Sequence, residues 1–212
     1  MATKYFEAVG HVQDSTSPNV ELNKHLGFLT LGRLEGFCIP EQATWLQRYL
    51  QDPKHSEIKE IAEIGFNSGH SANAFLSARK DIKVTSFEKS KRRHVNKGKS
   101  YIDEAYPGRH ELITGESLIT LPVAVHRDNL SFDMLFIDGS HRFANAYGDL
   151  MNGKQIVRKG GIAIMDDILP HKLWGRGPAK AWETVIESGL IQELEVVTAG
   201  PRTWAVGQYI NK

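Results

Sequence analysis

The stretch EIAEIGFNSGHSANAF, residues 60–75, decides the fold. It begins with a short apolar run that ends in an acid, passes through two glycines four residues apart, and continues into an amphipathic segment. The apolar run is typical of a strand, and the segment after the glycines is typical of a helix. A strand that turns tightly into a helix predicts an α/β fold with a ligand at the turn.

The same alternation of strand and helix continues along the chain. Further strands are predicted at residues 82–88, 110–114, 132–138 and 160–167. Helices are predicted between them and after the last one, and two final runs at 191–198 and 203–210 are joined by AGPR, which indicates a hairpin. Repeated strand–helix units require a parallel sheet that is covered on both faces. The predicted fold is a Rossmann-like, doubly wound, mostly parallel seven-stranded sheet with a C-terminal antiparallel hairpin.

Composition indicates one soluble domain. The chain has 212 residues, of which 41% are hydrophobic and 24% are charged, and its net charge of +1 gives no electrostatic case for nucleic acid or an anionic membrane. Residues 1–39 are interpreted as an N-terminal arm of the same domain, with a short helix, and residues 40–212 as the domain proper. The single cysteine, Cys38, is expected to be a buried thiol, and with no signal peptide or spanning segment the expected location is cytoplasmic.

Chemistry-bearing residues follow each of the five predicted parallel strands. Ligands of doubly wound sheets bind beyond the carboxyl ends of the strands, so these residues are expected to meet at one edge. They are Glu63–Ser71, Glu88, Gly115–Ser117, Asp138–His141 and Asp166–Asp167.

The glycine turn excludes two common nucleotide-binding fingerprints. A dinucleotide turn would need glycine at positions 67 and 70, where this chain has Asn67 and His70, and the P-loop pattern is absent as well. A second acid, Glu88, ends the next strand 25 residues after Glu63. An acid at that place suits two ribose hydroxyls, and the alternative is a solvated charge at a strand end.

Together these motifs resemble the class I S-adenosylmethionine-dependent methyltransferases. More narrowly, the chain is similar to the catechol O-methyltransferase-like group and to the metal-dependent macrolide-sugar O-methyltransferases. The resemblance rests on E-x-G-x-x-x-G-x-S at residues 63–71, Glu88, TGES at 114–117, FDMLFIDGSH at 132–141 and GGIAIMDD at 160–167. It covers residues 40–210 and implies that this segment is a methyltransferase domain.

The resemblance implies a binding site for S-adenosylmethionine. Gly65 and Gly69 would pass beneath the methionine part, Ser71 would bind its carboxylate, and Glu88 would hold the ribose. Helix capping alone is the alternative for Ser71 and Ser117, and core packing is the alternative for Phe66. The full set of expected cofactor-binding residues is Glu63, Gly65, Phe66, Asn67, Gly69, Ser71, Glu88, Gly115, Glu116, Ser117 and Asp138.

Three aspartates at the ends of two neighbouring strands point to a cation. Asp138, Asp166 and Asp167 would repel one another if they met without a positive charge, and all-oxygen ligands favour Mg²⁺ or another divalent ion. The metal-dependent relatives bind their cation with acids at these positions. The alternative is that some of these acids cap loops or pair with Arg142 or Lys172.

His141, three residues after Asp138, is the expected general base, with Asp138 as the second catalytic residue. The macrolide-sugar enzymes carry histidine at this place. The expected reaction is methyl transfer to a hydroxyl of a small molecule, assisted by the metal and the histidine base. The alternatives are a metal-independent N- or macromolecule methyltransferase and a non-catalytic cofactor-binding domain. The loop with His171 and Trp174 lies beside the predicted site, and it is expected either to cover a substrate or to be a surface connector with Trp174 packed onto the core. The arm is expected to form a wall of the site or a homodimer contact.

Overall fold

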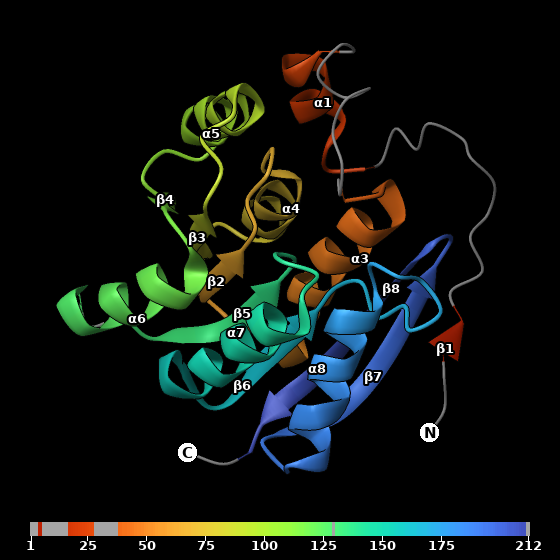
Figure 1. Cartoon of the computed structure of the whole chain (residues 1–212). Coiled ribbons are helices and arrows are strands. Elements are labelled where there is room, and N and C mark those ends of the chain that lie inside the picture. Colours follow the sequence, from red (N-terminus) through yellow and green to blue (C-terminus); the bar gives the residue numbers. More distant parts are fainter. Residues whose placement is uncertain (1–3, 6–16, 28–37, 129, 211–212) are drawn as a thin grey trace.

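The computed structural model describes residues 4–5, 17–27, 38–128 and 130–210, and it contains one mixed sheet with helices on both faces (Figure 1). The strand order is β1-β7-β8-β6-β5-β2-β3-β4. All neighbouring strands are parallel except that β8 is antiparallel to both β6 and β7. The strands are β1 (Lys4–Tyr5), β2 (Glu60–Ile64), β3 (Lys83–Glu88), β4 (His110–Thr114), β5 (Phe132–Ile137), β6 (Val157–Met165), β7 (Ile191–Ala199) and β8 (Arg202–Tyr209).

Strands β2 to β8 form the predicted seven-stranded, mostly parallel sheet, and the prediction of a doubly wound fold is confirmed. The two-residue strand β1 adds to the edge beyond β7. The hairpin forms the edge of these seven strands, and β8 is inserted between β6 and β7. This insertion places the start of β8 beside the end of β6, where Ile168 donates its backbone N–H to Thr203 O at 2.8 Å.

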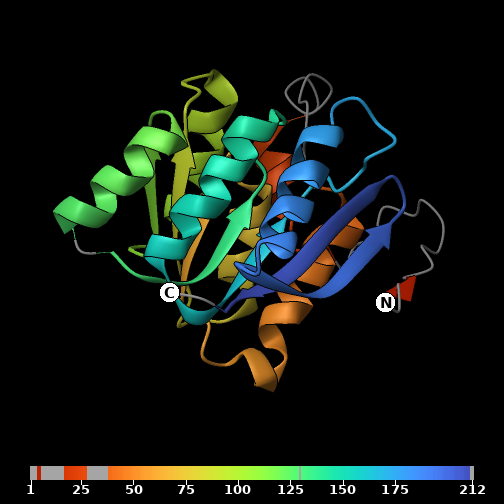
Figure 2. The ribbon, with the colours of Figure 1, turned by 60° about the horizontal axis from the view of Figure 1, so that its bottom comes forward.

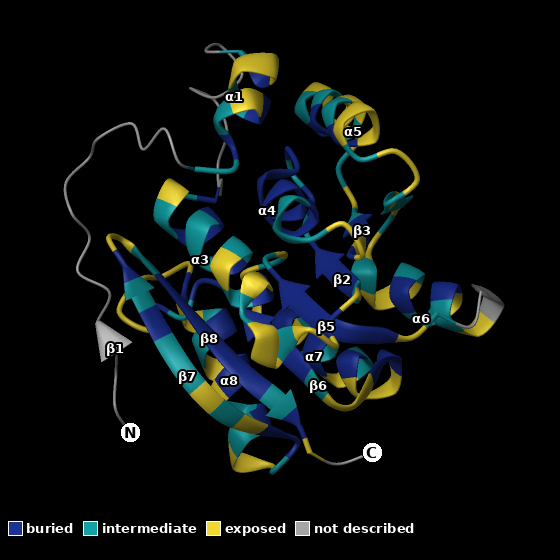
Figure 3. Ribbon diagram, turned by 180° about the vertical axis from the view of Figure 1, so that it is seen from behind, coloured by how far each residue is buried: buried dark blue, intermediate teal, exposed yellow. Residues whose placement is uncertain are grey.

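The helices divide the core into two layers (Figures 1 and 2). One face of the sheet is covered by α3, α4 and α5, and the other by α6, α7 and α8. Figure 3 shows that the central strands are buried and that exposed residues lie on the outer sides of the helices, in loops and on β7. These helices are α3 (Pro40–Gln51), α4 (His70–Ala78), α5 (Arg93–Ala105), α6 (Ser117–Asp128), α7 (Phe143–Ile156) and α8 (Arg176–Glu187), and a short 3-10 helix η1 spans Pro53–His55.

Local sequence explains where several of these elements begin. Pro40 occupies the first turn of α3, where its missing N–H has no intrahelical partner to lose. Helix α4 begins after Gly69, whose φ of 83° is a left-handed conformation that glycine adopts without strain. Cys38, just before α3, is buried as predicted.

The described part of the N-terminal arm contains the helix α1 (Val20–Leu26), which lies near α4 and α5 (Figure 1). Asn23 Oδ1 lies 2.9 Å from His70 Nε2, and the amide of Asn73 donates to Pro18 O at 2.7 Å. Lys97 also donates from α5 to Leu26 O at 3.1 Å. The short helix expected in the arm is therefore present, and the division of the chain at residue 39 stays a prediction. No described helix combines the length and the apolar character that a membrane span needs.

Candidate active site

A cavity of about 1040 Å³ opens at the carboxyl ends of β2, β3, β4 and β5. This is the edge at which doubly wound sheets bind their ligands. Its walls include seven of the eleven residues expected to bind a cofactor, which are Gly65, Asn67, Glu88, Gly115, Glu116, Ser117 and Asp138.

Glu88 is held by two loops at the end of β3. Its Oε2 accepts the backbone N–H of Asn67 at 2.9 Å, and its Oε1 accepts the backbone N–H of Ser90 at 2.6 Å. Asn67 has a positive φ of 49°, which turns its N–H toward the carboxylate. Each carboxylate oxygen has a second lone pair, so Glu88 remains able to accept two further hydrogen bonds from a ligand in the cavity.

Gly65 lies directly after β2, against the backbone that follows β5. Its φ is 94°, and a Cβ at this position would stand 2.0 Å from the backbone O of Asp138. Asp138 in turn donates its N–H to Ile64 O at 2.9 Å. The glycine is therefore required by contact between the ends of β2 and β5, and this contact positions Asp138 as well as the turn.

Four of the expected cofactor residues lie in the packed layer behind the cavity. Glu63 is fully buried and accepts short hydrogen bonds from the hydroxyls of Ser71 and Ser86. Ser86 also contacts His110 Nε2 at 2.9 Å. Phe66 is buried and stacks on His110 with 5.0 Å between the ring centroids, and Gly69 packs against the Phe66 ring.

The turn after β4 forms the opposite end of the cavity. Gly115 has a φ of 146°, and a Cβ there would stand 2.4 Å from Thr120 Cγ2. Glu116 forms an ion pair with Lys89 at 3.2 Å across the rim. The Ser117 hydroxyl bonds to Asp149 of α7, whose pKa is raised to about 6, chiefly because the carboxyl is buried.

A group of three ionisable side chains lies next to Asp138. One ligand atom each from Asp138, His141 and Asp167 fall within 4.8 Å of one another. His141 Nε2 lies 2.8 Å from Asp167 Oδ2, and this hydrogen bond raises the pKa of His141 against the opposing effect of its partial burial. Burial and the neighbouring Asp166 raise the pKa of Asp138 well above its usual value.

Asp166 is not a member of this group among the described residues. Its side chain is buried, and Oδ1 accepts the backbone N–H of Asp167 at 2.8 Å. Burial, followed by the charge of Asp167, raises the pKa of Asp166 to about 6. The bend between the two aspartates puts Asp167 at a positive φ of 60°, so their carboxylates serve different partners.

Arg202, at the start of β8, was not expected at this site. Its Nη1 donates to Asp167 Oδ1 at 2.7 Å, and its guanidinium lies 5.8 Å from the ring centroid of Trp174. The sequence places Arg202 in the AGPR turn, which carries no signal for catalysis. Only the register of β6 with β8, in which Met165 pairs with Ala205, brings Arg202 alongside Asp167.

A family model described as a methyltransferase domain matches residues 62–168, which is half of the chain. The chain belongs to this methyltransferase family. The match covers β2 to β6 and therefore includes the cavity walls, His141 and Asp167, but not Arg202. A comparison with curated protein sequences gave no match to this methyltransferase.

Solved structures similar to the methyltransferase share its fold at low sequence identity. An O-methyltransferase from Bacillus cereus in complex with SAH has a TM-score of 0.74 at 19% identity, with 93% of each chain covered. The O-methyltransferase TomG from Streptomyces achromogenes, which is involved in tomaymycin synthesis and is in complex with SAM, has a TM-score of 0.75 at 15% identity, with 95% of this chain and 92% of that chain covered. SAH-bound PaMTH1 from Podospora anserina has a TM-score of 0.71 at 20% identity, with 90% and 88% covered.

The buried carboxyl of Glu63 should give the stability of the methyltransferase a specific pH dependence. Burial raises its pKa from 4.5 to about 7 despite the serine hydrogen bonds. A raised pKa means that its contribution is complete below about pH 4.5 and is lost as the pH rises through about 7. Glu63→Gln should therefore gain roughly 3 kcal/mol in unfolding free energy relative to wild type between these pH values.

Urea unfolding at both ends of this pH range measures the effect. Glu111→Gln, at an exposed position in β4, is the matched control and should follow the wild type throughout. Parallel pH curves for Glu63→Gln and wild type would show that Glu63 is ionised in the folded state over the whole range.

Proposed function

We propose that the protein is an S-adenosylmethionine-dependent O-methyltransferase that acts on a hydroxyl of a small molecule. The observation that carries the proposal is that Asp138 belongs both to the cavity wall and to the group of three ionisable side chains. The cavity with Glu88 at one end reaches Asp138 at the other, and Asp138 belongs to the same group as His141 and Asp167. Solved structures of the same fold that are O-methyltransferases with SAM or SAH support this proposal.

The chain's own residues suit this cofactor. S-adenosylmethionine supplies a methyl group on a sulfonium ion, which is transferred to a nucleophile. Glu88 has lone pairs for the two ribose hydroxyls, and the turn at Gly65 lets the backbone border the cavity closely. Ser71 donates to Glu63 in the structure, so it would bind a cofactor carboxylate only after changing its hydrogen bond.

His141 is placed to remove the proton of an acceptor hydroxyl. Its Nε2 lies 2.8 Å from the Asp167 carboxylate, which can only accept, so we assign the proton to Nε2 and the lone pair to Nδ1. Asp167 holds the ring and stabilises the imidazolium that forms when Nδ1 accepts a proton. The imidazole is partly exposed, so an acceptor can reach it.

A divalent cation is the second part of the proposal. Asp138 and Asp167 offer two carboxylates in the same small group, which fits Mg²⁺ or Mn²⁺. A cation held there would lower the pKa of an acceptor hydroxyl. The expected ligand Asp166 lies outside the group of three, so we assign the carboxylate ligands to Asp138 and Asp167.

Thermal unfolding with S-adenosylhomocysteine tests the cofactor. A ligand at about a hundred times its Kd contributes about 2.7 kcal/mol to a native state that binds it, which should raise Tm by roughly 5–10 °C in a chain of this size. NAD at the same concentration is the control and should leave Tm unchanged, because the dinucleotide turn is absent. An unchanged Tm with saturating S-adenosylhomocysteine would refute the proposal.

A further inference from the structure

Among the described residues, Arg202 is the arginine that forms an ion pair with the Asp138, His141 and Asp167 group, through Asp167. Resting on the function proposed above, we propose that Arg202 competes with a divalent cation for Asp167 and thereby sets the cation affinity of this site. Arg202 is then a positioning residue, because it acts through Asp167 and its guanidinium need not touch the acceptor or the cofactor.

Each oxygen of Asp167 lies close to a nitrogen of another side chain. Oδ1 accepts from Arg202 at 2.7 Å, and Oδ2 lies 2.8 Å from His141. The Asp167 side chain is only 2% exposed and that of Arg202 only 16%, so water screens the pair weakly. A cation that binds Asp167 must take one of these oxygens, and it must also accept the repulsion of a guanidinium close by.

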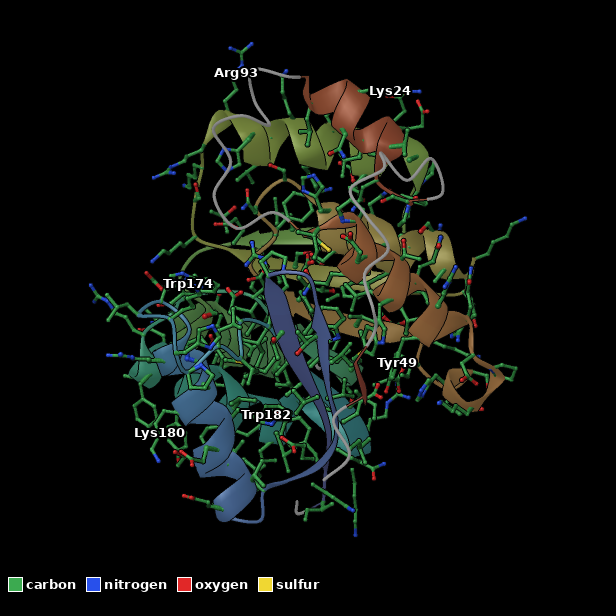
Figure 4. All side chains as sticks on the ribbon, turned by 90° about the vertical axis from the view of Figure 1, so that its right-hand side faces the viewer. Lys24, Tyr49, Arg93, Trp174, Lys180 and Trp182 are labelled. Atoms are coloured by element: carbon green, nitrogen blue, oxygen red, sulfur yellow. The ribbon has the colours of Figure 1, made fainter. Side chains whose placement is uncertain are left out.

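Four side chains form a closed ring of contacts that holds Arg202 in place. Arg202 lies between Asp167 and Trp174, whose ring centroid is 5.8 Å from the guanidinium carbon. Trp174 also contacts His141, with 5.7 Å between the ring centroids, and His141 in turn contacts Asp167. Figure 4 shows Trp174 on the loop that leads into α8, away from Trp182 further along that helix. Through Trp174, the loop before α8 thus contacts two charged or ionisable side chains of the site, Arg202 and His141.

Two possible roles of Arg202, competition with the cation and orientation of Asp167, predict opposite changes in cation affinity when Arg202 is removed. If Arg202 only orients Asp167, its loss frees the carboxylate to move, and the cation should bind more weakly. If Arg202 competes, its loss frees one oxygen and removes a positive charge, so the cation should bind more tightly. The sign of the change in cation affinity therefore distinguishes the two roles.

The experiment measures Mn²⁺ binding to the full chain after treatment with EDTA, by the loss of the free Mn²⁺ signal in electron paramagnetic resonance. No methyl donor or acceptor is added, so the result does not depend on turnover. Arg202→Gln should bind Mn²⁺ at least about tenfold more tightly than wild type, which is the scale of one charge-assisted hydrogen bond. Arg202→Lys keeps the charge and should stay closer to wild type.

Two further variants make the test specific. Arg158→Gln removes an arginine that pairs with Asp133 at the start of β6, outside the ring, and should leave Mn²⁺ affinity unchanged. Trp174→Leu keeps Arg202 but removes the aromatic face behind it, and should tighten Mn²⁺ binding by about threefold, since an exposed cation–π contact contributes about half of such a hydrogen bond.

The proposal is overturned if Arg202→Gln and Trp174→Leu bind Mn²⁺ no more tightly than wild type, or if none of the proteins binds it. Should Arg202→Gln fail to fold by circular dichroism, Trp174→Leu alone decides. A thermal shift with S-adenosylhomocysteine on the same samples separates the two proposals, because a normal shift without the affinity change rejects only the role of Arg202.

Discussion

His141→Ala should lower kcat by about 10²–10⁴-fold, which is the usual contribution of a general base. Affinity for S-adenosylhomocysteine should stay close to that of the wild type, because His141 is not among the residues that line the cavity. The effect is large because no other described histidine is paired with a buried carboxylate of the Asp138 group. Initial rates and thermal shifts on the same preparation measure the two quantities.

The pH profile of the wild type gives an independent check on the same residue. The base must be neutral to accept a proton, and Asp167 raises the pKa of His141 above its usual 6.5. kcat/KM should therefore fall with decreasing pH through a value higher than 6.5. His171→Ala, at an exposed position on the loop before α8, is the matched control and should keep both rate and profile. Unchanged turnover in His141→Ala would remove the histidine from the mechanism.

Gly65→Ala should abolish the thermal shift with S-adenosylhomocysteine and destabilise the protein by about 2–5 kcal/mol. The added Cβ would lie 2.0 Å from the backbone O of Asp138, and the φ of 94° is strained for any side chain. The substitution therefore moves the turn and Asp138 together.

Gly108→Ala distinguishes the cost of backbone strain at a positive φ from the cost of a steric clash of the added Cβ. Gly108 also has a positive φ, 70°, but nothing lies within 4 Å of a Cβ at that position. Its substitution should cost about 1 kcal/mol in urea unfolding and leave the shift with S-adenosylhomocysteine intact. Equal losses of stability in the two variants would contradict a role for the contact between Gly65 and Asp138.

The sequence predicts most of the fold because strand and helix alternate with clear periodicity from residue 58 onward. The cavity was also predictable, since strand-end residues such as Glu88 and Asp138 must meet at one edge of a parallel sheet. What the sequence could not provide was the direction of individual side chains. The Ser71 hydroxyl bonds to Glu63, and the Asp166 carboxylate bonds to the backbone N–H of Asp167, because neighbouring polar groups compete for these side chains.

Arg202 was beyond prediction for a different reason. Its partner Asp167 is 35 residues away in the sequence, and the two meet only through the antiparallel register of β6 and β8. A hairpin at the sheet edge, which the pattern of residues 191–210 indicated, does not specify that β8 enters between β6 and β7. Contacts that depend on strand order are not encoded in local periodicity.

The insertion of β8 also has a consequence for how the chain acquires activity during synthesis. The strands β2, β3 and β4 that build the Glu88 end of the cavity are close in sequence, so they can assemble soon after they leave the ribosome. Arg202 and the bond from Ile168 to Thr203 require β8, the last strand of the described chain, to enter between two strands already made. A nascent chain therefore builds the Glu88 wall of the cavity first and brings Arg202 to Asp167 last.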